Sequence, residues 1–147
     1  MNKILMVSPN KCTDCRTCES VCYNDAVNVI SIEDDDRTLS VSVMCMQCED
    51  AACLEICPTG ALSRDCSDTV VVDADKCIGC RMCVAACPFG NIQYSGRKKK
   101  IIKCDLCGGS PDCVKYCPTK AIEFVSATES NLKKKRVLAS KFKGLFE

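Results

Sequence analysis

The sequence predicts an α+β fold in which short antiparallel hairpins and short helices are organised around cysteines, followed by a C-terminal helix. Three observations support this prediction. The 147-residue chain contains 17 cysteines, far more than ordinary globular composition. It has no Trp, three Tyr and four Phe, too few large side chains for a conventional core of this size. Its cysteines also recur in four groups whose flanking residues resemble one another.

The four groups share the form Cys-x2-Cys-xn-Cys-x3-Cys, and they differ only in the middle interval. This interval is compact in the first and third groups, and it is two residues longer in the second group and three residues longer in the fourth. Cys66 lies outside every group, in a predicted hairpin turn, and we do not expect it to bind metal. The sixteen grouped residues are Cys12, Cys15, Cys18 and Cys22; Cys45, Cys48, Cys53 and Cys57; Cys77, Cys80, Cys83 and Cys87; and Cys104, Cys107, Cys113 and Cys117.

Each group predicts the same succession of elements: a strand, a cysteine loop, one or two helical turns between the third and fourth cysteines, and another strand. Pro follows the last cysteine in three groups, and its fixed φ suits a sharp exit from the helical turn. Tyr23 takes that position in the first group, where either an exposed ring or a ring that covers a cluster fits. Short strand-like runs follow, such as residues 27–32 and 122–125.

Other stretches between the groups also predict hairpins. Residues 70–72 are three valines, which favour a strand. The acidic stretch 31–43 and the basic stretch 96–102 predict hairpins with solvated tips.

The last segment, residues 126–147, predicts a basic amphipathic helix that docks on another surface. Ser126 and Glu129 form a candidate capping box. From residue 130 onward, five Lys and one Arg stand against one Glu, whereas the preceding part is net acidic by four. The surface could be the acidic body of the same chain, a partner protein or another copy. The residues at helical spacing on the apolar face are Leu138, Phe142, Leu145 and Phe146.

The cysteines are expected to bind metal. The N-terminal apolar run is too short for a secretory signal, and no stretch approaches the length of a membrane span. We therefore expect a cytoplasmic chain whose thiols stay reduced, which argues against disulfides. Zinc is the alternative metal, but structural zinc sites usually pair two Cys-x2-Cys knuckles or use His, and the chain has no His.

Iron–sulfur clusters explain the spacing better than zinc. Three thiolates on a compact Cys-x2-Cys-x2-Cys loop fit one face of a cubane, and the fourth cysteine then ligates a neighbouring cluster. The four groups therefore predict four [4Fe–4S] clusters.

With these motifs, the sequence resembles a bacterial-type ferredoxin doubled to four clusters. It is similar to the four-cluster iron–sulfur subunits of molybdenum and tungsten oxidoreductases, formate hydrogenlyases and carbon monoxide dehydrogenase systems. The resemblance covers about residues 1–125, and its carriers besides the cysteine groups are CPTGAL at 57–62, VDADKCIGC at 72–80 and KCDLC at 103–107. The chain looks most like the small ferredoxin-like subunits that accompany tungsten aldehyde oxidoreductases.

The resemblance implies two nested ferredoxin-like units. Groups two and three would form the inner unit, residues 44–94, and groups one and four the outer unit, residues 1–43 with 95–125. Motif order alone fits sequential pairing, of group one with two and three with four, equally well. The implied ligands are Cys12, Cys15, Cys18 and Cys117 for cluster A; Cys104, Cys107, Cys113 and Cys22 for cluster B; Cys45, Cys48, Cys53 and Cys87 for cluster C; and Cys77, Cys80, Cys83 and Cys57 for cluster D.

The sequence predicts an electron carrier rather than an enzyme, because it offers no base, nucleophile pair or open metal position. One hypothesis is a subunit that relays single electrons between a catalytic oxidoreductase and another redox partner. The resemblance favours a tungsten- or molybdenum-cofactor aldehyde oxidoreductase, with a formate dehydrogenase, hydrogenase or carbon monoxide dehydrogenase system as alternatives. A free polyferredoxin and a scaffold whose clusters only support folding are the other hypotheses.

The C-terminal helix favours the subunit over the free carrier, because a subunit can lay such a helix on its partner or on another copy, linking chains. We expect neither nucleic-acid binding nor a membrane span. Direction of electron flow is left open by the sequence.

Overall fold

The computed structural model describes residues 3–140, without the side chains at positions 130, 131, 133, 134, 137 and 138. Eight strands, two 3-10 helices and five α-helices follow one another in this part of the chain. In order they are β1 (Lys3–Val7), η1 (Pro9–Lys11), α1 (Thr17–Val21), β2 (Asn28–Asp34), β3 (Arg37–Val43), α2 (Ala52–Glu55), β4 (Leu62–Arg64), β5 (Val70–Val72), α3 (Met82–Ala86), β6 (Gln93–Ser95), β7 (Lys100–Ile102), η2 (Leu106–Gly109), α4 (Asp112–Lys115), β8 (Ile122–Ser126) and α5 (Ala127–Ser140).

The strands form four antiparallel pairs, which confirms an α+β fold of short hairpins and short helices. Three pairs are hairpins between neighbours in sequence: β2–β3, β4–β5 and β6–β7. The fourth pair joins β1, at the start of the described chain, to β8, which precedes α5, with Lys3 opposite Ser126 and Val7 opposite Ile122. Because an isolated two-stranded ribbon is marginal in water, each pair depends on what it packs against.

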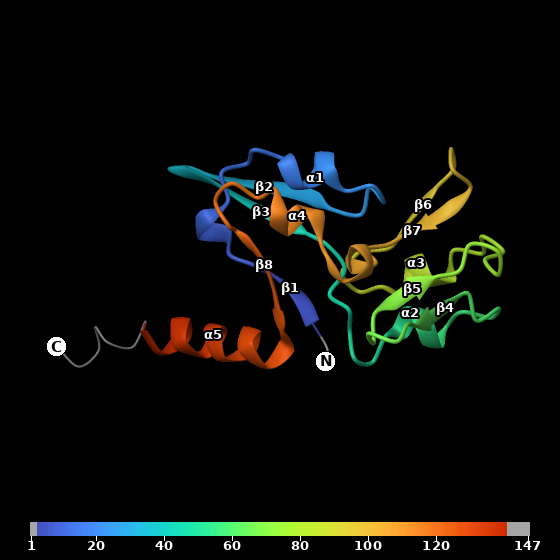
Figure 1. The fold of residues 1–147 in the computed structure, drawn as a ribbon. Coiled ribbons are helices and arrows are strands. Elements are labelled where there is room, and N and C mark those ends of the chain that lie inside the picture. The colour runs from blue at the N-terminus through green and yellow to red at the C-terminus, as the bar shows by residue number, and fades with distance from the viewer. Residues whose placement is uncertain (1–2, 141–147) are drawn as a thin grey trace.

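The buried residues gather in two cores (Figure 1). The first core lies among β1, β8, α1, α4 and the β2–β3 hairpin, and α1 contacts α4 there. The second lies among α2, α3 and the β4–β5 and β6–β7 hairpins, and α2 contacts α3. The large side chains are few, as the composition predicts. The first core comprises Leu5, Cys18, Ala26, Val27, Val29, Met44, Cys104, Leu106, Cys113, Cys117, Ala121 and Ile122, and the second Ala51, Leu62, Val70, Cys83, Ile92 and Ile101.

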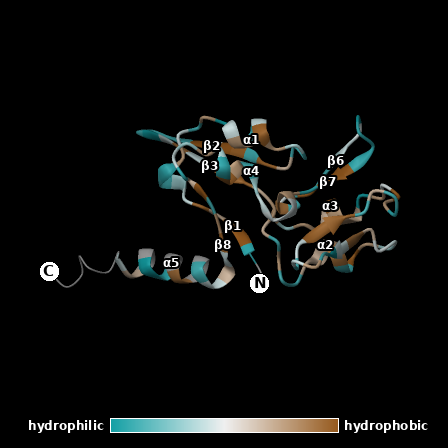
Figure 2. Cartoon of the chain, viewed as in Figure 1, coloured by the Kyte–Doolittle hydropathy of each residue, from teal (hydrophilic) through white to brown (hydrophobic). Residues whose placement is uncertain are grey.

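The tips of the β2–β3 and β6–β7 hairpins point away from the cores and are hydrophilic (Figure 2). They carry the acidic and basic stretches for which solvated tips were expected. In the basic tip, the Lys98 ammonium lies 2.5 Å from the Asp25 carboxylate. This exposed contact connects the second half of the chain to the first, together with a 2.9 Å hydrogen bond from Gln93 Nε2 to Asn28 Oδ1.

The helix α5 follows β8 directly and extends away from the cores beside β1 and β8 (Figure 1). Its capping box is confirmed: the Glu129 N–H donates to Ser126 Oγ at 3.2 Å, and the Ser126 N–H donates to Glu129 Oε2 at 3.3 Å. The predicted apolar face lies outside the described side chains. Within residues 3–140, no helix combines the length and apolar character needed to cross a bilayer.

Candidate metal centres

Sixteen cysteines line four small cavities, with four cysteines in each. Every cavity takes three cysteines from one group and the fourth from another, and groups one and four share two cavities, as do groups two and three. We name them by their cysteines: cavity A has Cys12, Cys15, Cys18 and Cys117; cavity B has Cys22, Cys104, Cys107 and Cys113; cavity C has Cys45, Cys48, Cys53 and Cys87; and cavity D has Cys57, Cys77, Cys80 and Cys83. Cys66 is exposed in the turn between β4 and β5 and lines none of the four.

A left-handed residue shapes the start of every cysteine loop. Two positions after the first cysteine of each group, φ lies between +49° and +70°. This conformation reverses the local curvature of the chain, at a cost of roughly 1–2 kcal/mol for a residue with a side chain. Only the third group uses glycine, which avoids that cost. The four residues are Asp14, Gln47, Gly79 and Leu106.

A second left-handed residue follows the last cysteine of every group by three positions. Its N–H donates to the carbonyl of that cysteine at 3.1 to 3.5 Å, closing a turn. The turn directs the next N–H at sulfur: Ala26 donates to Cys22 Sγ at 3.4 Å, and Ala121 donates to Cys117 Sγ at 3.3 Å. The recurring residues after the last cysteine are therefore explained by the turn that they form. The left-handed residues are Asp25, Gly60, Gly90 and Lys120.

These contacts and burial push the thiol pKa values in opposite directions. Burial opposes ionisation of Cys57, but the N–H groups of Leu62, Thr59 and Ala61 outweigh it and lower its pKa to about 7. Burial raises the pKa of Cys104 and of Cys113 to about 12. Thiols with a raised pKa, such as Cys104 and Cys113, become thiolates at neutral pH when a metal takes the place of the proton.

The donor set fits iron–sulfur clusters. All seventeen cysteines are free thiols, and each cavity offers four of them. Four thiolates around a cavity match the all-cysteine ligation of a [4Fe–4S] cluster. Among the described residues, no three His, Cys, Asp or Glu side chains converge closely enough to hold a single metal ion.

Solvent reaches the cavities unequally. Cavities A and D each have one exposed cysteine, Cys15 and Cys80, whereas no cysteine of cavities B and C is exposed. Cavities A and B share the first core, and Cys45 of cavity C packs against it. The other cysteines of cavity C, except Cys48, pack with cysteines of cavity D on the second core.

Three residues near the cavities have contacts that the sequence did not predict. Tyr23 is 59% exposed, and its hydroxyl donates to the Asp105 carboxylate, which joins the exit of group one to the loop of group four. Gln47 and Lys103 are buried polar residues that line cavity C and donate to the carbonyl of Cys104, a cysteine of cavity B. The only sequence signal for them is their position beside ligand cysteines, which indicates nothing about burial.

Comparisons with known sequences agree with this chemistry. Residues 37–127 match the family described as the 4Fe-4S dicluster domain, and residues 5–28 match that described as the 4Fe-4S binding domain. The chain is 34% identical over 96 residues to the electron transport protein HydN of Escherichia coli (strain K12), covering 56% of this chain and 54% of HydN.

Two similar proteins from the same organism carry the names of enzyme components. One is a component of anaerobic dimethyl sulfoxide reductase, with 36% identity over 97 residues, covering 52% of this protein and 47% of that component. The other is hydrogenase-4 component A, with 32% identity over 90 residues, covering 56% of this protein and 43% of that component. The chain thus spans about half the length of the curated relatives it matches.

Proposed function

The chain belongs to the 4Fe-4S dicluster domain family, and we propose that it is the electron-transfer subunit of an oxidoreductase complex. Its two matched 4Fe-4S regions and seventeen cysteines establish that it binds multiple [4Fe–4S] clusters. When bound, these clusters supply one-electron chemistry. The chain's own residues hold the clusters, and we propose no catalytic residue for it.

The single observation that carries this proposal is the distribution of sixteen cysteines over four cavities. We assign clusters A, B, C and D to cavities A, B, C and D, with four cysteines each as ligands. The shared cavities support pairing of group one with four and of group two with three. The β1–β8 pair and the two cores support the nested units, residues 44–94 inside 1–43 and 95–125. The β6–β7 hairpin crosses that boundary and contributes Ile101 to the second core.

The clusters would conduct in the order A, B, C, D. Cys18 of cavity A and Cys113 of cavity B pack in one core, and Cys45 of cavity C contacts the same core. Exposed Cys15 and Cys80 belong to the two ends of that order, where electrons would enter and leave. Because no cysteine of cavities B and C is exposed, an electron on cluster B or C would pass to a neighbouring cluster more readily than to an acceptor in solution.

The partner that we propose is a catalytic subunit with a tungsten or molybdenum cofactor, of the aldehyde oxidoreductase type. The similarity to the dimethyl sulfoxide reductase component and to hydrogenase-4 component A supports a catalytic partner, and it fits a hydrogenase or formate system equally. The seventeen free thiols support a reducing compartment, for which we propose the cytoplasm. Residues 126–147 would dock on the partner or link the chain to another copy.

Anaerobic purification of the tagged full-length chain from its native cells tests this function. We expect about sixteen irons and as many acid-labile sulfides per chain, without stoichiometric zinc. We also expect a co-purifying catalytic subunit, whose tungsten, molybdenum or nickel content identifies the class of partner. Isolation of the chain alone would favour a free carrier, and near-stoichiometric zinc would overturn the cluster assignment.

Deletion of residues 130–147 tests the docking segment. Light scattering of the purified assembly should show a smaller mass if this segment holds the partner or a second copy. An unchanged mass would exclude both roles, and gel electrophoresis of the deletion sample distinguishes which component is lost.

A further inference from the structure

We propose that Lys103 is a buried positive charge that raises the reduction potentials of clusters B and C. This inference rests on the proposed function, because it requires clusters in the four cavities. Lys103 is not a cluster ligand, and it lies next to cavities B and C.

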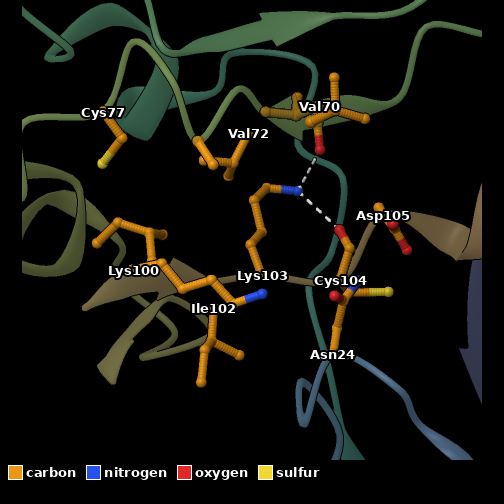
Figure 3. A pocket seen from close by; sticks show the side chains of 12 residues that line it. Asn24, Val70, Val72, Cys77, Lys100, Ile102, Lys103, Cys104 and Asp105 are labelled. Atoms are coloured by element: carbon orange, nitrogen blue, oxygen red, sulfur yellow. Dashed lines mark hydrogen bonds between the residues drawn. The ribbon is translucent and has the colours of Figure 1, made fainter. Parts of the chain in front are cut away.

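Lys103 is enclosed by the protein and faces two ligand segments at once. It is 5% exposed, and its side chain lines cavity C together with the four cysteines there. Its Nζ donates to the Val70 carbonyl at 2.6 Å and to the Cys104 carbonyl at 3.0 Å (Figure 3). The second of these carbonyls belongs to a cysteine of cavity B, so the ammonium touches the boundary of both cavities.

Gln47 holds the same two peptide segments in place. Its Nε2 donates to the Cys104 carbonyl at 2.9 Å, and its Oε1 accepts from the Val70 N–H at 2.9 Å. Gln47 is 3% exposed and comes from the loop of group two. Gln47 thus ties together the two segments whose carbonyls accept from the Lys103 ammonium, and this fixes the position of the charge relative to the cavities.

The Lys103 charge lacks a carboxylate partner: within residues 3–140, no Asp or Glu oxygen lies within ion-pair distance of its Nζ. Two carbonyl dipoles compensate a buried ammonium only in part. An anionic cluster in the adjoining cavity would supply the missing negative charge.

The direction of the effect follows from the charge that a cluster gains. Reduction adds one negative charge, so a nearby positive charge stabilises the reduced state more than the oxidised state and raises the potential. The interaction is strong where water is excluded and weak where solvent screens it. The two hydrogen-bond acceptors of the Lys103 ammonium, Val70 and Cys104, line cavities C and B and neither of the other two. The Lys103 side chain also shares the pocket in Figure 3 with Cys77 of cavity D, which makes no hydrogen bond to the ammonium.

Reduction potentials of the full-length, cluster-loaded chain test this inference by redox titration with electron paramagnetic resonance. In Lys103→Met, we expect two of the four clusters to become harder to reduce by at least about tenfold in equilibrium constant, equal to about 59 mV for one electron. The other two should shift by much less. Lys103→Arg should leave all four reduction potentials close to their wild-type values, because arginine keeps the positive charge.

A matched control is available three residues away. Lys100 begins β7, which ends one residue before Lys103, and it is exposed, so Lys100→Met removes an equal charge with little effect on any potential. Unchanged potentials in Lys103→Met, or an equal shift of all four clusters, would overturn the proposal. If that variant loses iron, Lys103→Gln decides, because it keeps hydrogen-bond donors without the charge. Loss of iron in both would assign Lys103 to cluster assembly and also overturn it.

Failure of the proposed function is a separate outcome. A wild-type chain that lacks about sixteen irons would refute the clusters before any variant is compared.

Discussion

Cavities A and D, built on the compact cysteine groups, differ from cavities B and C, built on the widened groups, in their access to solvent. The middle cysteines of the compact groups, Cys15 and Cys80, are exposed. In the fourth group, Cys104 and Cys113 are buried, and no cysteine of the second group is exposed.

One cysteine motif can therefore place its cluster in either of two electrostatic environments. In a solvated site, water and ions screen nearby charges, so the protein has little control over the potential. In a buried site the same charge acts at a lower effective dielectric constant, and fewer charges are needed. The widened groups thus provide the setting in which one lysine can influence two clusters.

Replacement of a buried ligand cysteine should give the largest effect. Cys113→Ser removes a ligand from cavity B and a sulfur from the first core, so we expect loss of roughly a quarter of the iron and a lower melting temperature. Cys15→Ser, at the exposed cysteine of cavity A, should also lose one cluster but keep a melting temperature closer to wild type. Iron analysis and thermal melts of anaerobic samples measure both.

Cys66→Ser is the matched control for these variants, because Cys66 is exposed and outside the cavities. It should retain all the iron. Equal destabilisation by Cys113→Ser and Cys15→Ser would remove the distinction between middle and end cavities.

The backbone of the widened fourth group provides the next test. Gly108 and Gly109 have φ values of +64° and +98°, and a Cβ at either would meet no atom within 4 Å. The cost of Gly109→Ala is therefore backbone strain of about 1–2 kcal/mol, which should lower the melting temperature by roughly 2–8 °C. Gly96→Ala, in a hairpin tip without a positive φ, is the control and should cause no loss.

A drop in melting temperature for Gly96→Ala as large as that for Gly109→Ala would contradict this account. It would show that the two turns tolerate a side chain equally, whatever their backbone angles.

The two compact groups can be compared through an arginine that occupies the same position in both. Arg81 lies over the Tyr94 ring at 4.2 Å from its centroid, whereas Arg16 forms exposed ion pairs with Asp14 and Glu19 at 3.2 and 3.5 Å. We expect Arg81→Ala to cost about 0.5–1 kcal/mol through the lost cation–π contact. Arg16→Ala should cost less, since surface ion pairs are worth about 0–1 kcal/mol.

A double-mutant cycle with Tyr94→Leu measures the Arg81 contact directly from the melting data. A coupling of zero between Arg81 and Tyr94 would assign no stability to the stacking. A larger loss of stability from Arg16→Ala than from Arg81→Ala would contradict the expected order of the two contacts.

The local elements could be predicted from the sequence because their signals are local. Residues 70–72 form β5, the capping box at Ser126 and Glu129 is present, and short helices lead to the fourth cysteine of each group. Ligation by the sixteen cysteines stays a prediction. The Gln47–Lys103 arrangement could not be predicted, because it depends on Val70 and Cys104, which are 23 and 57 residues from Gln47 in sequence. Only the packing of the two cores brings these segments together.

The smallest expected effect concerns Tyr23, which stands where the other groups have proline. Tyr23→Phe removes the hydroxyl that donates to Asp105, and the ring is 59% exposed, so we expect a cost below about 1 kcal/mol.

Burial, followed by the Asp105 carboxylate, raises the pKa of Tyr23 above its usual value. A tyrosine whose pKa is higher in the folded chain stabilises the fold at any pH below its pKa in the unfolded chain, about 10. This stabilisation decreases as the pH rises above that value. The difference in melting temperature between wild type and Tyr23→Phe should therefore be constant from pH 7 to about 9 and narrow above about 10. A difference that widened with pH would mean that the hydroxyl is not the donor in this contact.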